Sequence, residues 1–146
     1  MSEAKAAILR LMNEYTYRID SGDLEGFASL FEHANLHVLG DPNGPISGKD
    51  EVLGLLKNVT LYDGVPHTKH VMTNVQIDVD ESDNTATAQS YITVFQALAP
   101  DFPLQAIFIG RYHDVFSKAT EGWRFQSRII SPDLIGDLSR HRADMA

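Results

Sequence analysis

The chain has 146 residues, of which 43% are hydrophobic, and its formal net charge at pH 7 is −8. This length suits one domain, residues 1–146, that buries its own core, and the lack of cysteine excludes disulfide bonds and thiolate metal sites. The negative charge argues against nucleic acids and anionic membranes as partners, because both bind basic patches.

The first residues, 1–5, lack the basic and then apolar layout of a signal peptide. No apolar run approaches the roughly 18 residues that are needed to cross a bilayer. We therefore expect a cytoplasmic protein without a membrane partner.

The first part of the chain carries helical patterns. Apolar residues from Ile8 to Ile19 recur at helical spacing and predict an amphipathic helix over about residues 3 to 20. Asp23 follows and suits the N-cap of a second, short helix. Apolar residues within 24–31 would form the packed side of this helix.

A short strand, a loop and a third helix are expected next. Residues 35–39 alternate weakly and predict the strand, and the loop follows at 41–45, where proline, asparagine and glycine gather. Ser47 has Asp50 three residues later, which resembles a capping box and predicts the start of a third helix that extends to about Val59.

After residue 65 the pattern changes to strands that are joined by short turns. We expect the strands at 68–79, 85–98, 104–116 and 123–130. Such a succession forms an antiparallel meander, and helices followed by strands indicate an α+β fold. The sheet is expected to curve around the first helices and enclose a pocket.

A last helix is predicted after the strands. Ser131 and Pro132 are suited to the N-cap and first helical positions, and the residues that would form its apolar side are Leu134, Ile135 and Leu138.

Histidines stand at the start of the first long strand. His67 and His70 suggest a metal pair, but strand residues three apart point to opposite faces, and zinc or iron needs a third ligand close by. We therefore expect no metal. Asp20, at the end of the first helix, suits a solvated helix-end acid, and Tyr15, on its apolar stripe, suits a core tyrosine with a hydrogen-bonded hydroxyl.

The orientation of two charged residues stays open at this point. By strict alternation, Arg128 lies on the face opposite Phe125, and His70 lies opposite Val75 and Ile77. Either both side chains face solvent, or a bulge in each strand turns them into the pocket.

Three segments together resemble one known family. These are residues 15–20 with Gly22-Asp23 and Leu30-Phe31, residues 67–70 with Thr73-Asn74, and residues 122–125 leading to Arg128. The chain is similar over nearly its whole length to the SnoaL-like branch of the nuclear transport factor 2-like superfamily. The resemblance implies a cone-shaped α+β barrel, with a curved antiparallel sheet wrapped around N-terminal helices and an internal pocket.

The resemblance also implies site residues. In similar enzymes, namely scytalone dehydratase, bile acid 7α-dehydratase and hexachlorocyclohexane dehydrochlorinase, an Asp on the first helix pairs with a His on this strand; Asp20 and His70 occupy those positions. Tyr15 matches a tyrosine of the bile acid enzyme, where the dehydrochlorinase has a lysine. The Trp-x-Phe-x-x-Arg ending of the dehydrochlorinase matches the segment from Trp123 to Arg128 and favours the inward orientation of Arg128.

General chemistry supports such a pair. A buried carboxylate against one imidazole nitrogen fixes the tautomer and stabilises the imidazolium that forms when the other nitrogen takes a proton. Tyr15 would donate a hydrogen bond to a leaving oxygen or an enolate, and Arg128 would stabilise negative charge. These groups suit proton abstraction beside a carbonyl, followed by elimination or isomerisation, and they need no cofactor.

We expect a small, mostly apolar, ring-shaped substrate, because aromatic residues would form the pocket walls. The predicted substrate-binding residues are His67, Tyr17, Tyr91, Phe95, Phe108 and Tyr112. The alternative function is a non-catalytic ligand-binding or assembly module that resembles the small subunit of ring-hydroxylating dioxygenases. A closed cavity with Asp20 and His70 in hydrogen-bond contact favours the enzyme, whereas a shallow or filled cavity favours the module.

The outer face of the sheet should carry apolar side chains at alternate positions. Ile107, Ile109 and Val115 are the residues that we expect there. A second copy of the chain would cover them, so we expect a homodimer or homotrimer.

Overall fold

The computed structural model describes residues 2–145, and its first helix forms where apolar residues repeat at helical spacing. This helix, α1, spans Glu3–Asp20 and buries Ile8, Met12 and Ile19 on one side. The side chain of Ser2 caps it by accepting a hydrogen bond from the backbone N–H of Lys5 at 3.1 Å. The predicted bounds of the first helix are confirmed.

Two further helices and six strands complete the main architecture. The helices are α2 (Leu24–Ser29) and α3 (Gly48–Leu56), and a 3₁₀ turn spans Ala143–Met145. The strands are β1 (Asn35–Val38), β2 (Ile46–Ser47), β3 (Thr68–Asp80), β4 (Thr85–Leu98), β5 (Phe102–Ala119) and β6 (Gly122–Ile135).

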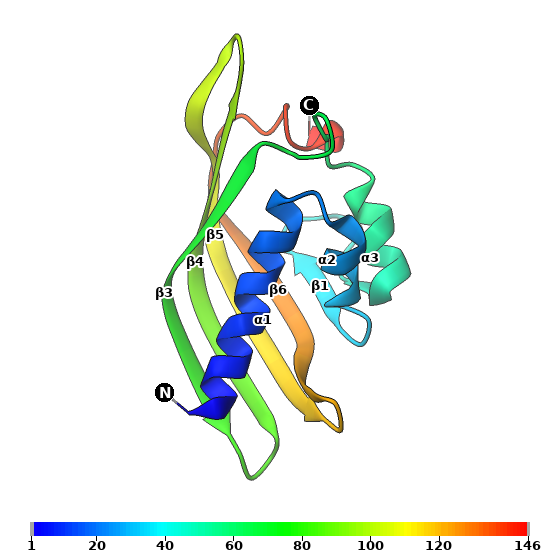
Figure 1. The fold of residues 1–146 in the computed structure, drawn as a ribbon, viewed down its shortest axis with the longest axis vertical. Helices are drawn as coiled ribbons and strands as arrows, with labels where there is room; N and C mark the ends of the chain where they lie inside the picture. The colour runs from blue at the N-terminus through cyan, green and yellow to red at the C-terminus, as the bar shows by residue number, and fades with distance from the viewer. Residues whose placement is uncertain (1, 146) are drawn as a thin grey trace.

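The strands form one curved sheet in the order β2-β1-β6-β5-β4-β3, and the helices lie on one side of it (Figure 1). β3 to β6 form the predicted antiparallel meander. β1 pairs with β6 in parallel, so the complete sheet is mixed, and its edges do not join to close a barrel. The predicted α+β class, with helices against a curved sheet, is confirmed.

Bulges decide which side chains face the helices. In β3, Thr73 pairs with Tyr91 and Gln76 pairs with Gln89, so β3 has one residue more than β4 between these pairs. Asn74 adopts a positive φ of 55° there. The extra residue shifts the alternation and puts His70 on the same face as Val75.

A second bulge acts in the same way on β6. Phe125 pairs with Phe116 and Ser127 pairs with Val115, which leaves Gln126 as the extra residue. Arg128 therefore shares the inner face with Phe125 and is completely buried. Of the two orientations that the sequence left open, the structure has the inward one.

The predicted last helix is wrong. Ser131 and Pro132 pair with Arg111 and Gly110, so they belong to β6, which continues to Ile135. Proline is tolerated here because the register shifts next to it, and a bulge needs no ladder donor at each residue. Pairing with the long strand β5 thus keeps these residues extended, although their local sequence is typical of a helix start.

Two smaller predictions also need correction. The Ser47 side chain makes no cap hydrogen bond to α3; instead the Glu51 carboxylate accepts the backbone N–H of Ser47 at 2.8 Å. Ile107 is fully buried and not on the outer face, because β5 bulges there and leaves it without a partner on β4. Ile109 and Val115 are half-buried, and association with another copy stays a prediction.

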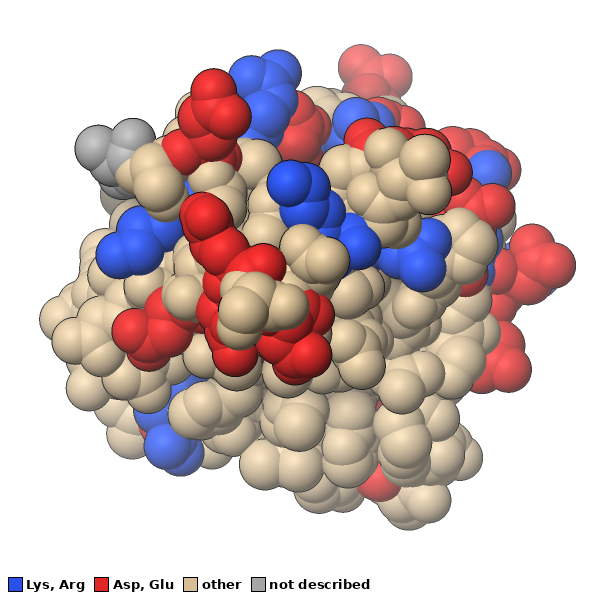
Figure 2. Space-filling view, turned by 90° about the horizontal axis from the view of Figure 1, so that it is seen from below, with Lys and Arg blue, Asp and Glu red and all other residues tan. Residues whose placement is uncertain are grey.

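The face shown in Figure 2 carries acidic side chains interspersed with basic ones. Within residues 2–145, no helix is both long and apolar enough to cross a membrane.

Candidate active site

The end of α1 and the start of β3 place a carboxylate beside a histidine. α1 ends at Asp20, and the chain then turns at Gly22, which has a φ of +80°. A Cβ atom on Gly22 would collide with the carbonyl oxygen of Gly64, so glycine permits the close approach of the loop before β3. This approach brings the first residues of β3 onto the Asp20 side chain.

Asp20 binds this strand through three hydrogen bonds. Its Oδ1 atom lies 2.6 Å from Nδ1 of His70 and accepts the Thr68 hydroxyl at 2.8 Å. Its Oδ2 atom accepts the backbone N–H of His70 at 2.8 Å. The side chains of His70 and Asp20 are only 9% and 11% exposed, so the contact is short and shielded from solvent. The predicted proximity of these two residues is confirmed.

These contacts define the protonation of the neutral imidazole. An ionised carboxylate only accepts hydrogen bonds, so Nδ1 of His70 carries the hydrogen and Nε2 keeps its lone pair. Among the described residues, no group donates a hydrogen bond to this Nε2. His70 lines the cavity, so its basic nitrogen is available to a bound molecule.

The same contacts keep Asp20 ionised. Burial alone would raise the pKa of the Asp20 carboxyl, but the hydrogen bonds from His70 and Thr68 and the charge of a protonated His70 lower this pKa below its ordinary value. A carboxylate that stays charged can stabilise the imidazolium form of His70.

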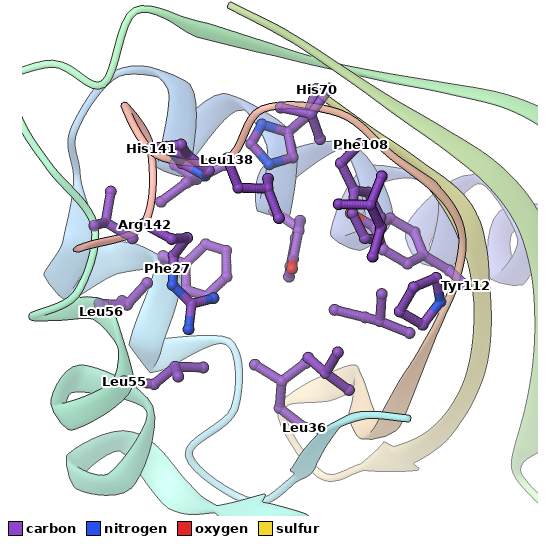
Figure 3. A pocket seen from close by; sticks show the side chains of 18 residues that line it. Phe27, Leu36, Leu55, Leu56, His70, Phe108, Tyr112, Leu138, His141 and Arg142 are labelled. Carbon is purple, nitrogen blue, oxygen red and sulfur yellow. The ribbon is translucent and has the colours of Figure 1, made fainter. Parts of the chain in front are cut away.

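The cavity is small and mostly apolar. Its volume is about 170 Å³, and its wall includes Phe27, Leu36, Leu56 and Phe108 (Figure 3). An apolar cavity of about 150 Å³ is enough to hold benzene. The space therefore suits a ligand of about one six-membered ring.

A second buried charge pair lies beside the cavity. Arg128 on β6 makes a bidentate pair with Asp114 on β5, with both N···O distances at 2.8 Å and neither side chain exposed. The guanidinium carbon lies 3.7 Å from the ring centroid of Tyr112 and 4.4 Å from that of Tyr15. Arg128 is not part of the cavity wall, so it contacts the tyrosines and not the ligand space.

Tyr15 and Tyr112 do line the cavity and remain neutral phenols. Burial raises the pKa of Tyr15, although the Arg128 charge and a hydrogen bond with Tyr112 act in the opposite direction. Burial also raises the pKa of Tyr112 well above its ordinary value. Both hydroxyl groups are therefore hydrogen-bond donors across the neutral pH range.

The predicted substrate-binding residues divide into two groups. Phe108 and Tyr112 line the cavity. Tyr17 is 72% exposed on α1, and Tyr91 is 52% exposed on the outer face of β4, where it alternates with the buried residues Ser90 and Ile92. Phe95 also lies outside the cavity wall, and so does His67, which is exposed with a φ of 57° and its ring near that of Tyr62.

The sequence analysis missed three residues of this region. Thr68 donates a hydrogen bond to Asp20, and Asp114 is the partner of Arg128. Asp114 alternates with the buried residues Tyr112 and Phe116, and this period of two indicates that it points inward. His141 lines the cavity from the segment after β6, where no periodic pattern marks it.

A metal site is not formed by the described part of the chain. Within it, no three His, Cys, Asp or Glu side chains lie close enough together to hold an ion. Such a group is the usual minimum for a protein metal site.

Comparison with known proteins shows the family. The sequence profile of the SnoaL-like domain matches residues 1–129, which is most of the chain, so the protein belongs to the SnoaL-like domain family. No curated protein matches the sequence.

Solved structures agree with this assignment. A proposed scytalone dehydratase from Novosphingobium aromaticivorans is 25% identical with a TM-score of 0.70, over 91% of this chain and 86% of that one. LinA is 20% identical with a TM-score of 0.72, over 92% and 89%. A proposed aromatic ring hydroxylase from N. aromaticivorans is 23% identical with a TM-score of 0.74, over 94% and 96%. The chain thus has the nuclear transport factor 2-like fold, which is also found in a further protein of that organism.

Proposed function

We propose that this SnoaL-like domain is a cofactor-free lyase or isomerase with His70 as its general base. The observation that carries the proposal is the 2.6 Å contact between Nδ1 of His70 and Asp20, combined with a free Nε2 atom on a mostly apolar cavity. The cavity size and its apolar wall favour a small cyclic or aromatic substrate. A non-catalytic binding module would need neither the tautomer control nor the shielded carboxylate.

The reaction begins with proton transfer from carbon. The Nε2 lone pair of His70 takes a proton from the carbon beside a substrate carbonyl, and the C–H electron pair moves onto the carbonyl oxygen as an enolate. Asp20 stabilises the imidazolium that forms. The enolate then expels a β-hydroxyl group, which takes the proton from the His70 imidazolium and leaves as water, or it takes this proton back from the imidazolium at another carbon. The first route is elimination and the second is isomerisation.

The tyrosines supply hydrogen bonds to the developing charge. Tyr15 lines the cavity, and its ring lies 6.5 Å from that of His70. In this scheme its neutral hydroxyl donates to a leaving oxygen or an enolate. Arg128 is a positioning residue in this scheme, because its guanidinium contacts both tyrosine rings and stays outside the cavity wall.

Deuterium exchange tests the base directly. Small cyclic ketones and β-hydroxy ketones are incubated with the protein in D₂O, and NMR follows exchange at the α-carbon and loss of water. We expect exchange with the wild type and a fall of roughly 10²–10⁴-fold in His70→Ala. His67→Ala is the matched control, because His67 lies outside the cavity wall. Near-wild-type exchange in His70→Ala would overturn the proposal, and ligand binding without any exchange would favour the binding module.

A further inference from the structure

A second histidine reaches the cavity from the last segment of the chain. His141 lies on the cavity wall, and its ring centroid is 6.1 Å from that of His70 (Figure 3). It follows β6 and stands outside residues 1–129, which the family profile matches. The His141 side chain therefore belongs to a part of the cavity wall that the family profile does not match.

Hydrogen bonds hold the backbone around His141 in place. The carbonyl oxygen of His141 accepts the backbone N–H of Thr60 at 2.9 Å, and its own N–H donates to Leu138 at 3.0 Å. The preceding carbonyl, of Arg140, accepts the Tyr62 hydroxyl at 2.6 Å and the Gln96 side chain at 3.2 Å. Figure 1 shows this segment running beside the loop that precedes β3. The imidazole is thus presented to the cavity by a fixed backbone.

The surroundings of the ring define which nitrogen carries the hydrogen. Nδ1 of His141 is buried and has no hydrogen-bond partner among the described residues. A buried N–H without a partner is rarer in proteins than a buried acceptor without one, which favours a bare Nδ1 and a hydrogen on Nε2. Nε2 is not sealed off as Nδ1 is, and the ring lines the cavity, so this N–H is available to a ligand.

The charge state agrees with this geometry. Burial, together with the positive charges of a protonated His70 and of Arg142, lowers the pKa of His141 to about 4, while Asp20 acts in the opposite direction. His141 is therefore neutral near pH 7. A neutral imidazole can donate a hydrogen bond to an oxygen without first giving up a full charge.

The two imidazoles have complementary chemistry. His70 presents a lone pair because Asp20 takes its Nδ1 hydrogen, whereas His141 presents an N–H. A carbonyl oxygen and its α-carbon are about 2.4 Å apart, and each polar contact adds about 3 Å, so one O=C–C–H unit can reach both rings.

We propose that His141 is a further catalytic residue whose neutral Nε2–H binds the substrate carbonyl oxygen and stabilises the enolate that forms when His70 removes the α-proton. The proton moves from carbon to Nε2 of His70, and the electron pair moves to the oxygen that His141 holds. This inference rests on the proposed function, and it narrows the substrate to ring-sized ketones with an α-hydrogen.

Cyclohexanone is a suitable probe because it has one ring and one carbonyl. Infrared spectroscopy measures its C=O stretch when it is bound, and NMR in D₂O measures α-proton exchange. In the wild type we expect the stretch to move to lower frequency. His141→Phe should lose this shift and exchange roughly 10²-fold more slowly, while His141→Gln, which keeps an N–H donor, should retain most of both. The control is His113→Phe, which changes an exposed histidine on β5. Its C=O stretch and its exchange rate should match those of the wild type.

The outcomes separate this inference from the function on which it rests. A carbonyl shift that depends on His141 without any α-exchange would support the role of His141 in oxygen binding and contradict His70 as the base. Exchange that persists at the wild-type rate in His141→Phe, with an unchanged stretch, would overturn the role of His141. Failure of cyclohexanone to bind the wild type would overturn the ketone assignment. ¹⁵N NMR gives a test without ligand, because a hydrogen on Nδ1 of His141 at neutral pH would also overturn it.

Discussion

Two carboxylates that are shielded from solvent pair with two basic side chains, and the pairs differ in what the basic side chain can still do. Asp114 binds Arg128 through both of its oxygens, and neither side chain is exposed. Asp20 binds His70 through one ring nitrogen, and the other ring nitrogen belongs to the cavity wall. The first pair is sealed and permanently charged, whereas the second is open on one side and can change its charge.

The difference separates a positioning role from a chemical one. The negative charge of Asp114 and its hydrogen bonds raise the pKa of Arg128 above its ordinary value, against the effect of burial, so this guanidinium does not exchange protons at any relevant pH. It contacts the rings of Tyr15 and Tyr112 and fixes their positions. The Asp20–His70 pair leaves one basic atom free, which is the requirement for a general base.

The largest expected effect comes from breaking the sealed pair. Asp114→Asn removes the counter-charge of Arg128 and should lower the free energy of unfolding by about 3–5 kcal/mol, because a buried charge is left uncompensated. Urea unfolding followed by circular dichroism measures this change. Asp133→Asn is the matched control, since it breaks an exposed pair with Arg111 and should change stability little. A loss in Asp114→Asn no greater than in this control would contradict the structural role of the sealed pair.

Breaking the open pair, Asp20 with His70, should mainly reduce turnover, whereas breaking the sealed pair mainly reduces stability. Asp20→Asn leaves a residue of the same size but removes the counter-charge and misorients the imidazole, so turnover should fall by roughly 10²–10⁴-fold, as in His70→Ala. The double mutant should be little worse than either single mutant, because the two residues act as a unit. Steady-state rates on an identified substrate measure all three. Additive losses in the double mutant would show that Asp20 does not act through His70.

Acid titration distinguishes the histidine of the last segment from Asp20. The pKa of His141 is about 4 in the folded state, below its ordinary value of 6.5, so between these values the unfolded state binds the additional proton. Stability should therefore fall by about 3 kcal/mol as the pH drops from 6.5 to 4. The pKa of Asp20 is lowered too, but its contribution is present above the unfolded value of 3.8 and is lost only below it.

Urea unfolding at several pH values between 4 and 7 measures this contribution. The charged and titratable groups that face His141 are His70, Arg142 and Asp20, and all three remain in His141→Phe. This variant should have a flatter stability profile across the window than the wild type. An equal slope in the two proteins would show that His141 does not carry the effect.

The sequence predicted the fold well because its signals are local and repeated. The bounds of α1 follow from apolar spacing, and β4 was predicted residue for residue at 85–98. The last helix was wrong because Ser131 and Pro132 form a helix-start signal in isolation, while pairing with β5 keeps them extended. Strand pairing between distant residues is absent from any local pattern, and it decides this case.

The sequence predicted some residues of the candidate site and missed others. Asp20 and His70 were identified through the family resemblance, and the inward orientation of His70 depends on the bulge at Asn74, which the sequence allowed but did not require. Tyr91 lies on the outer face because β4 alternates regularly and buries Ser90 and Ile92 on either side of it, so Tyr91 does not line the cavity. Backbone hydrogen bonds hold His141 at the cavity, one of them from the distant Thr60, and no sequence pattern marks such contacts.

The smallest expected effect comes from Tyr15, which lies between the Asp114–Arg128 pair and the Asp20–His70 pair. The ring of Tyr15 lies 4.4 Å from the Arg128 guanidinium carbon and its centroid 6.5 Å from that of His70. Tyr15→Phe keeps the ring on Arg128 but removes the hydroxyl from the cavity, so the sealed pair should retain its stability. Turnover should fall by roughly tenfold, which corresponds to about 1.4 kcal/mol, the upper range for a neutral hydrogen bond. Steady-state rates and urea unfolding of the same samples measure both. If stability falls and turnover does not, the Tyr15 hydroxyl stabilises the Asp114–Arg128 pair and does not take part in the reaction at His70.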